Sequence, residues 1–112
     1  MMEKSERRAA TAAYKERKAP AGVFALRCVA TGEIWVGHAP DLDKIWNRLS
    51  FSLKTGGHPR RALQAAWRQH GEAGFAFERL ETLEEPLDEP YLRSELEDRA
   101  AAWREKLGAA AV

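Results

Sequence analysis

Apolar residues in three segments of the chain follow the patterns of β-strands. Residues 23–29 are apolar on both faces, which predicts a strand buried on both sides. Thr31 and Gly32 supply a tight turn, and residues 33–37 return as a second strand, so the pair predicts a β-hairpin. Residues 75–81 alternate large apolar side chains with small or polar ones, which predicts a third, half-buried strand.

Spacings of three and four residues between apolar positions predict four helices. The first spans residues 3–18 and has a thin apolar face. The second begins after a predicted N-cap at Asp41 and ends at Gly56-Gly57. Pro59 is expected to open the third, Gly71 to end it, and Gly108 to cap the last. The expected inward positions of the last three helices are Leu42, Ile45, Trp46, Leu49 and Leu53, then Leu63, Ala66, Trp67 and His70, then Leu92, Leu96, Ala100, Trp103 and Leu107.

The predicted order of elements is therefore α-β-β-α-α-β-α. This order favours the α+β class, with a small, three-stranded, mostly antiparallel sheet flanked by helices. We expect residues 1–19 to form an N-terminal helical extension and residues 20–112 to form a single domain that includes the C-terminal helix.

Composition supports one ordinary globular domain. The chain has 112 residues, of which 45% are hydrophobic and 31% charged. No apolar run approaches the ~18 residues of a membrane helix, and the charged start shows no signal peptide. The single cysteine, Cys28, excludes an internal disulfide and a multi-cysteine zinc site. We expect a cytoplasmic protein without a membrane partner.

Charge is distributed unevenly although the net charge is only +1. Residues 80–112 hold four basic and nine acidic residues, whereas residues 44–79 hold seven basic and two acidic ones. Guanidinium and amide groups match phosphate oxygens, so this basic region is a candidate nucleic-acid surface, and a merely solvated helix face is the alternative. Its candidate ligands are Lys44, Asn47, His58, Arg60, Arg61, Gln64 and Arg68.

His58 and the tryptophans each have a structural and a functional interpretation. His58 lies between Gly57 and Pro59, where capping the next helix and hydrogen bonding to a phosphate are equal alternatives. The spacing of Trp46, Trp67 and Trp103 favours the core over an exposed base-stacking platform, and Trp35 is left open.

Two tripeptides resemble the paired motifs that name the GIY-YIG nuclease family. Gly22-Val23-Phe24 is followed, after ten residues, by Trp35-Val36-Gly37. The helix with Asn47-Arg48 and the strand at residues 75–81 resemble the family's later elements, so the resemblance covers about residues 20–82. It implies a small three-stranded antiparallel sheet flanked by helices, and a nuclease that hydrolyses phosphodiesters with one divalent metal ion, Mg²⁺ or Mn²⁺.

The resemblance implies functional positions, and several of them depart from the family pattern. Arg48 matches the helix arginine that stabilises charge on phosphate. Phe24 and Trp35 replace the two catalytic tyrosines, so the first position has no hydroxyl and the second only an indole N–H. The position of the metal-binding glutamate corresponds to Ala100. The metal ligand is therefore unassigned, with Glu78, Glu95 and Glu97 as weak candidates.

Three functions are consistent with these observations. The first is a divergent metal-dependent endonuclease that uses Arg48. The second is a catalytically degenerate module that still binds nucleic acid, most simply DNA. The third is a protein-interaction domain, which the acidic C-terminal third suggests. Oligomeric state is left open.

Overall fold

The computed structural model describes residues 19–83 and 91–112. The predicted N-terminal helix over 3–18 and the acidic stretch at 84–90 lie outside the described residues. No helix among the described residues is long and apolar enough to cross a membrane. The described elements, in chain order, are β1 (Gly22–Cys28), β2 (Ile34–Ala39), α2 (Leu42–Thr55), α3 (Arg61–His70), a 3₁₀ turn η1 (Glu72–Gly74), β3 (Phe75–Thr82), α4 (Tyr91–Leu107) and β4 (Ala110–Ala111).

The four strands form one sheet in the order β3-β1-β2-β4. β1 pairs antiparallel with both β2 and β3, while β4 pairs parallel with β2. The α+β class and the antiparallel hairpin are confirmed, but the predicted count of three strands is wrong. Ala110–Ala111 has no strand periodicity. It joins the sheet because the turn after α4 brings the chain beside Trp35 and Val36, where backbone groups pair without help from side chains.

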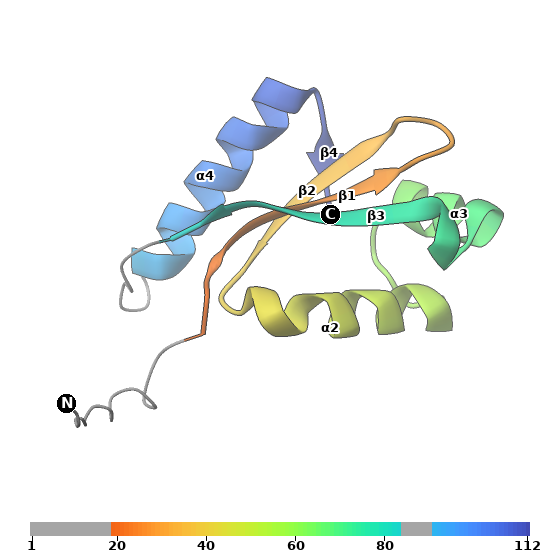
Figure 1. Cartoon of the computed structure of the whole chain (residues 1–112), viewed down its shortest axis with the longest axis horizontal. Helices are drawn as coiled ribbons and strands as arrows, with labels where there is room; N and C mark the ends of the chain where they lie inside the picture. The colour runs from red at the N-terminus through yellow and green to blue at the C-terminus, as the bar shows by residue number, and fades with distance from the viewer. Residues whose placement is uncertain (1–18, 84–90) are drawn as a thin grey trace.

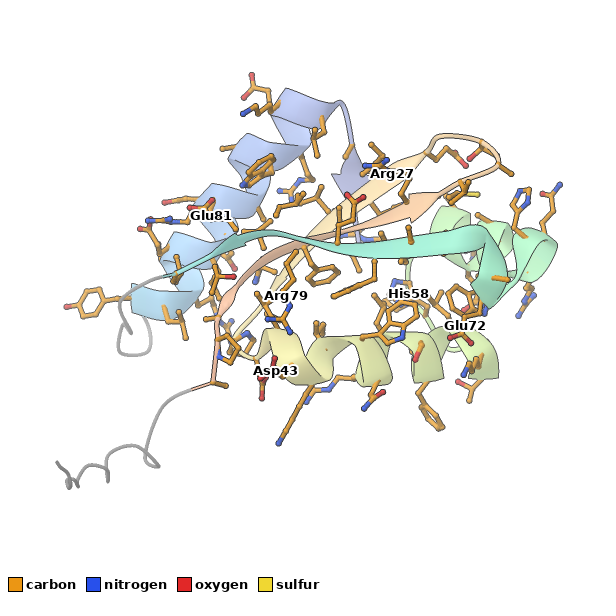
Figure 2. The ribbon with its side chains drawn as sticks, viewed as in Figure 1. Arg27, Asp43, His58, Glu72, Arg79 and Glu81 are labelled. Atoms are coloured by element: carbon orange, nitrogen blue, oxygen red, sulfur yellow. The ribbon has the colours of Figure 1, made fainter. Side chains whose placement is uncertain are left out.

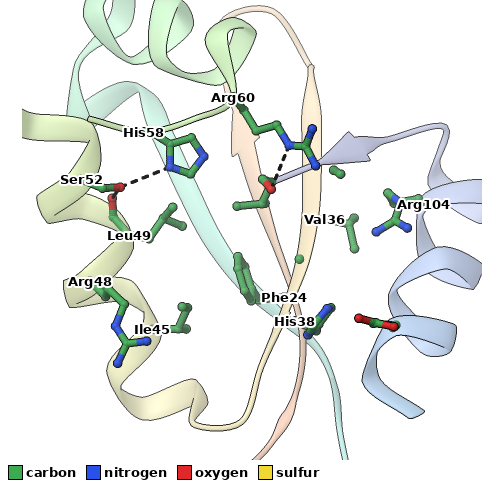
Figure 3. Close-up of a pocket in the computed structure, with 14 residues that line it drawn as sticks. Phe24, Val36, His38, Ile45, Arg48, Leu49, Ser52, His58, Arg60 and Arg104 are labelled. Atoms are coloured by element: carbon green, nitrogen blue, oxygen red, sulfur yellow. Dashed lines mark hydrogen bonds between the residues drawn. The ribbon is translucent and has the colours of Figure 1, made fainter. Parts of the chain in front are cut away.

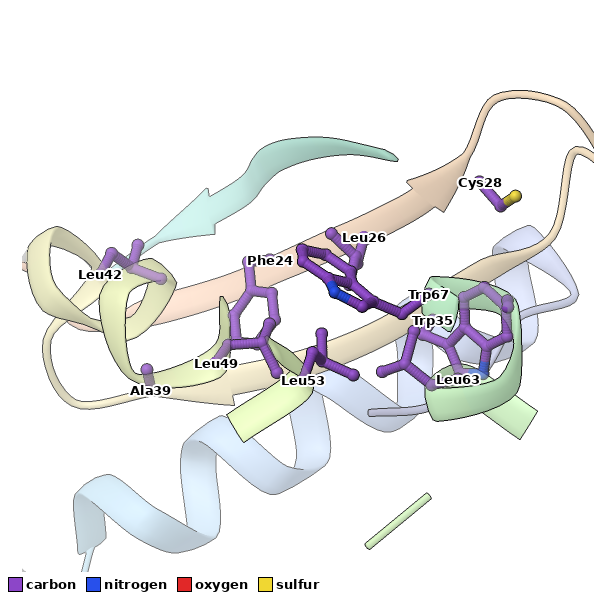
Figure 4. Close-up of a cluster of buried hydrophobic side chains, with 11 residues drawn as sticks. Phe24, Leu26, Cys28, Trp35, Ala39, Leu42, Leu49, Leu53, Leu63 and Trp67 are labelled. Carbon is purple, nitrogen blue, oxygen red and sulfur yellow. The ribbon is translucent and has the colours of Figure 1, made fainter. Parts of the chain in front are cut away.

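The sheet is covered on both faces, with α2 and α3 on one side and α4 on the other (Figure 1). β1 supplies side chains to both layers: Phe24 and Leu26 pack toward α2 and α3, and Val23 and Ala25 pack toward α4. This placement explains why residues 23–26 are apolar without alternation. Figure 4 shows the larger cluster, in which the aromatic rings of Trp35 and Trp67 are enclosed between the sheet and α3.

The ends of α2 follow the predicted signals. The Asp41 side chain accepts a hydrogen bond from the Asp43 N–H at 3.0 Å, and Gly56 ends the helix with φ +83°. The start of α3 differs from the prediction, because the helix begins at Arg61, two residues after Pro59. Arg60 at the N-cap makes no side-chain capping bond, which leaves the Arg60 side chain available to the neighbouring surface.

α4 is held to the sheet by one polar group as well as by apolar packing. The Glu81 carboxylate of β3, labelled in Figure 2, accepts hydrogen bonds from Trp103 Nε1 at 3.0 Å and from the Arg99 guanidinium. The bond from Trp103, together with Arg99, lowers the pKa of Glu81. Leu107 was expected to face inward but is 37% exposed, because this end of α4 extends past the sheet.

Candidate active site

A pocket of about 680 Å³ lies at the side of the sheet where β2 and β4 meet α2 and α4 (Figure 3). Its floor is the hairpin, at Phe24, Val36 and Gly37. One wall is α2 and the loop before α3, and the opposite wall is α4 together with the chain after it. Elements far apart in sequence therefore contribute side chains to one concave surface, which is the usual form of a ligand site.

The two tripeptides meet at the floor of this pocket. Phe24 of β1 lies opposite Gly37 of β2 in the antiparallel register. A Cβ at Gly37 would lie 2.8 Å from Phe24 Cζ and 3.1 Å from Val112 Cβ, so only glycine permits this ring position. Phe24 also stacks on Phe77, with ring centroids 5.3 Å apart. Phe24, which replaces the first motif tyrosine, therefore lines the pocket as an apolar surface without a proton acceptor.

Trp35 does not line the pocket. It is 3% exposed and packs in the core, with its ring 6.2 Å from that of Phe75. Trp35 lies two residues before Gly37 on the same face of β2, and that step takes its ring away from the pocket and into the packing beside α3, so the pocket geometry does not support its candidate catalytic role. The open question about Trp35 is resolved in favour of the core, as for Trp67.

The α2 wall presents Ile45, Leu49 and Ser52 to the pocket, with Arg48 at its edge. The Arg48 side chain is exposed and also borders a smaller hollow of about 60 Å³ that Lys44 lines. No ion pair among the described residues includes Arg48. Its guanidinium is therefore free to bind an anion at the pocket entrance.

The His58 loop is fixed by a chain of hydrogen bonds. The His58 backbone N–H donates to Gln64 Oε1 at 3.2 Å, and Gln64 Nε2 donates to the Leu53 carbonyl at 2.8 Å. Gln64 is 7% exposed, so its amide links two segments in the interior and is not presented at the surface, as its candidate role in nucleic-acid binding requires. The His58 ring lines the pocket, and its two predicted roles, capping of the next helix and hydrogen bonding to a phosphate, both stay predictions.

Hydrogen bonding assigns the His58 tautomer. Ser52 Oγ donates to the Leu49 carbonyl at 2.9 Å, so it receives the hydrogen of His58 Nδ1 at 3.2 Å. His58 Nε2 then carries a lone pair, and this buried atom has no partner among the described residues. Burial, reinforced by the charge of Arg60, lowers the pKa of His58. Its Nε2 is a neutral acceptor in the pocket wall.

His38 is a second imidazole of the same kind. Burial lowers its pKa; Glu97 opposes that shift, while Arg104 and Arg93 add to it. His38, Glu97 and Arg104 all line the pocket, and Figure 3 shows His38 and Arg104 on the side nearest α4. At neutral pH this side of the pocket therefore holds a neutral ring between opposite charges.

The three candidate metal ligands separate in the structure. Glu97 lines the pocket. Glu78 instead pairs with Arg27 at 3.0 Å, and Glu95 with Arg99 at 2.6 Å, and neither residue lines the pocket. Ala100, the position that the resemblance implies for the glutamate, is 0% exposed against the sheet and holds no ligand.

The donor set does not form a complete cation site by itself. Within residues 19–83 and 91–112, no three His, Cys, Asp or Glu side chains cluster closely enough to hold a metal ion. Glu97 and His38 are the donors that the pocket offers on its α4 side. A hard cation such as Mg²⁺ is commonly held by one or two carboxylates together with substrate phosphates. The pocket residues therefore fit a cation shared with a bound phosphate.

The candidate nucleic-acid ligands divide into two groups. Arg60 lines the pocket, where its Nε donates to the Val112 carbonyl at 3.2 Å, and His58 lies beside it. The others are outside the pocket on exposed helix surfaces: Lys44 and Asn47 on α2, and Arg61 and Arg68 on α3. Sequence reasoning missed Arg104, which lines the pocket from α4. The available signal was its seven-residue spacing from Glu97, which places both on one helix face.

Two solved structures resemble this chain. One is the catalytic domain of the intron endonuclease I-TevI in a point-mutant form, with a TM-score of 0.69 and 27% identity over 80% of this chain and 84% of that one. The other is the catalytic domain of the homing endonuclease I-TevI, with a TM-score of 0.66 and 26% identity over 79% of this chain and 88% of that one. No protein-family model matches the chain, and no curated protein matches it by sequence.

This similarity covers 80% of the chain and confirms the fold that the tripeptides implied. I-TevI is a GIY-YIG homing endonuclease, so the match also supports a nuclease at the level of the family. The chain has the fold of a GIY-YIG nuclease catalytic domain.

Proposed function

We propose that this chain is a GIY-YIG nuclease-family domain with a divergent active site, which binds the phosphodiester backbone of a nucleic acid, DNA in the first instance, in the pocket. One observation carries the proposal. Arg48 from α2, Arg60 from the loop before α3, and Arg104 from α4 line the same pocket. Arginines from three separate elements give an anion three directions of approach, and guanidinium groups match phosphate oxygens.

The surroundings of these arginines strengthen their attraction for phosphate. The floor is apolar at Phe24, Ile45 and Leu49, and an apolar wall reduces the screening of nearby charges by water. Glu97 is the only acidic side chain among the described residues that line the pocket, against three arginines, so positive charge prevails there. Neutral His58 accepts hydrogen bonds and does not add a further charge.

Hydrolysis of the bound phosphodiester is the second candidate function, and Glu97 and His58 favour it. A divalent ion held by Glu97 and the phosphate would supply charge neutralisation at the scissile group. His58 supplies the unprotonated nitrogen that Phe24 lacks. Its Nε2 is buried and without a partner among the described residues, so the ring would have to turn toward the pocket to take a proton from the attacking water. Arg48 and Arg60 would hold the phosphate while charge develops on it.

Binding is tested by fluorescence anisotropy with labelled single-stranded, duplex and branched DNA at several salt concentrations. We expect Arg104→Ala to weaken binding to all sequences alike and to reduce the slope of log affinity against log salt by about 1. Arg27→Ala is the matched control, because Arg27 is an exposed arginine paired with Glu78 away from the pocket. Wild-type protein that shows no salt-sensitive binding would overturn the proposal and favour the protein-interaction alternative.

Cleavage is tested on the same substrates with Mg²⁺ or Mn²⁺, against a blank with EDTA. Metal-dependent cutting that is lost in Glu97→Gln and in Arg48→Ala would support hydrolysis. The control is Glu95→Gln, because Glu95 lies on the same helix and pairs with Arg99. Salt-sensitive binding without cutting would overturn the second candidate and leave a binding domain on a nuclease fold.

A further inference from the structure

The outer side of α2 carries an exposed aromatic ring that the pocket does not use. Phe51 is 68% exposed, and the helix lies along one side of the molecule with the sheet and α3 on its other side (Figure 1). A single exposed apolar residue is ordinary on a protein surface. The side chains around Phe51 are what distinguish it.

Phe51 lies at the centre of a basic face. Successive residues of a helix turn by about 100°, so residues three, four and seven positions away lie within about 60° of Phe51 around the axis. The residues of α2 at these positions are Lys44, Asn47, Arg48, Lys54 and Thr55, and all five are exposed. We call this set, with Phe51, the α2 outer face.

Acidic residues do not neutralise the centre of this face. Asp43, on the same helix, is turned about 80° from Phe51 and pairs with Arg79 at 2.7 Å (Figure 2). Lys54 pairs with Glu72 of the 3₁₀ turn at 3.2 Å, at the far end of the helix. Lys44 and Arg48 appear in none of the ion pairs among the described residues. The face is complementary to an anionic polymer.

Arg48 joins this face to the pocket. It lines the pocket edge and is also one helical turn, about 4.5 Å along the axis, from Phe51. A strand whose phosphate lies in the pocket would pass Arg48 and reach the Phe51 ring with its next bases. Aromatic rings among basic side chains bind single strands in this way, because every unstacked base offers a π-face.

We propose that the α2 outer face binds single-stranded nucleic acid, with Phe51 as a stacking platform for one base beside the phosphate held in the pocket. The inference rests on the proposed function, because Arg48 serves both surfaces. Bases inside a duplex are already stacked on each other, so the ring gives affinity only to single-stranded or unpaired substrates. The chain therefore prefers a single strand or a single-stranded junction to a continuous duplex.

The test measures the affinity of wild-type protein and of Phe51 variants for a labelled single-stranded oligonucleotide and for the matching duplex. We expect Phe51→Ala to weaken single-strand binding by at least about fivefold and duplex binding by less than about twofold. Phe51→Trp should retain or improve single-strand binding, and Phe51→Leu, which is apolar but cannot stack, should behave like Phe51→Ala. Tyr91→Ala is the matched control, because Tyr91 is a 70% exposed aromatic residue on α4.

The outcomes separate the two proposals. If Arg104→Ala weakens binding while Phe51→Ala does not, the pocket function stands and the stacking platform is overturned. Equal losses for single strand and duplex in Phe51→Ala, or a Tyr91→Ala loss as large as that of Phe51→Ala, would also overturn it. Wild-type protein without salt-sensitive binding would overturn the proposed function itself, and the stacking proposal with it.

Discussion

The Gln64 side chain links the end of α2 to the loop that carries His58, and its removal tests whether buried hydrogen bonds hold that side of the pocket. Its amide donates to the Leu53 carbonyl at 2.8 Å and accepts from the His58 N–H at 3.2 Å. Gln64 is among the few buried polar side chains of the described residues, so water has little access to replace either bond. The perturbation is Gln64→Ala.

The expected cost follows from these two bonds. Each is worth about 0.5–1.5 kcal/mol net, and a buried donor left without a partner costs about 1–3 kcal/mol more. The Leu53 carbonyl retains a bond from the Gly56 N–H at 3.3 Å, so the penalty falls mainly on the His58 N–H. We expect a loss of about 2–4 kcal/mol, a large fraction of the ~5–15 kcal/mol by which a domain of this size is stable.

Urea unfolding monitored by tryptophan fluorescence measures this loss. Gln69→Ala is the control on the same helix, because Gln69 is exposed, and it should cost less than about 0.5 kcal/mol. Gln64→Glu keeps an oxygen that accepts from the His58 N–H but puts a carboxylate oxygen in place of the amide that donates to the Leu53 carbonyl, so this variant should also destabilise the domain. A cost below about 1 kcal/mol for Gln64→Ala, with an unchanged m-value, would refute the reasoning.

Two further predictions concern backbone packing and pH. Gly22→Ala places a Cβ 2.0 Å from the Glu81 backbone oxygen, so we expect urea unfolding to show that the free energy of unfolding falls by at least about 2 kcal/mol. The control is Gly57→Ala, whose Cβ would lie 3.7 Å from its nearest atom and should cost less than about 0.5 kcal/mol. Equal costs for the two variants would contradict this prediction. Burial lowers the pKa of His38 and His58, so below pH 6.5 the unfolded chain binds protons that the folded chain refuses. The free energy of unfolding should therefore fall as the pH drops through 6.5. This fall should be smaller in His38→Gln and in His58→Asn than in the wild type. Equal pH profiles for the variants and the wild type would contradict the lowered pKa of these two histidines.

Much of the fold could be predicted because its signals are local. The hairpin of β1 and β2, the Asp41 cap and the apolar stripe of α2 each depend on residues close together in the chain, and all three are confirmed, although the hairpin turn spans residues 29–32 instead of Thr31-Gly32 alone. The fourth strand could not be predicted, because Ala110–Ala111 has no periodicity and pairs with β2 only where the tertiary structure places it. The prediction that Leu107 faces inward was wrong for the same reason. Its position on α4 matches the inward side of the helix, but the tertiary structure leaves the side chain 37% exposed.

The site was predictable residue by residue only in part. The structure brings three candidates, Arg48, Arg60 and His58, into one pocket together with Glu97, which was one of three carboxylate candidates. Residue types alone did not distinguish Glu97 from Glu78 and Glu95, because ion pairing decides which carboxylate is free to bind a ligand. The partner of Glu78 is Arg27, which is distant in the sequence, so this ion pair could not be read from the local pattern.

The sequence by itself determined the elements, their order and the pair of tripeptides that resemble a nuclease motif. Those features depend on local periodicity, turn chemistry and spacing, which a chain carries before it folds. The tertiary structure alone decided which side chains share a surface: it placed Phe24 in the pocket, enclosed Trp35 and Gln64, and brought Arg104 opposite Arg48. The reason is that burial and charge convergence depend on contacts between distant segments, and these exist only once the sheet and both helix layers have packed.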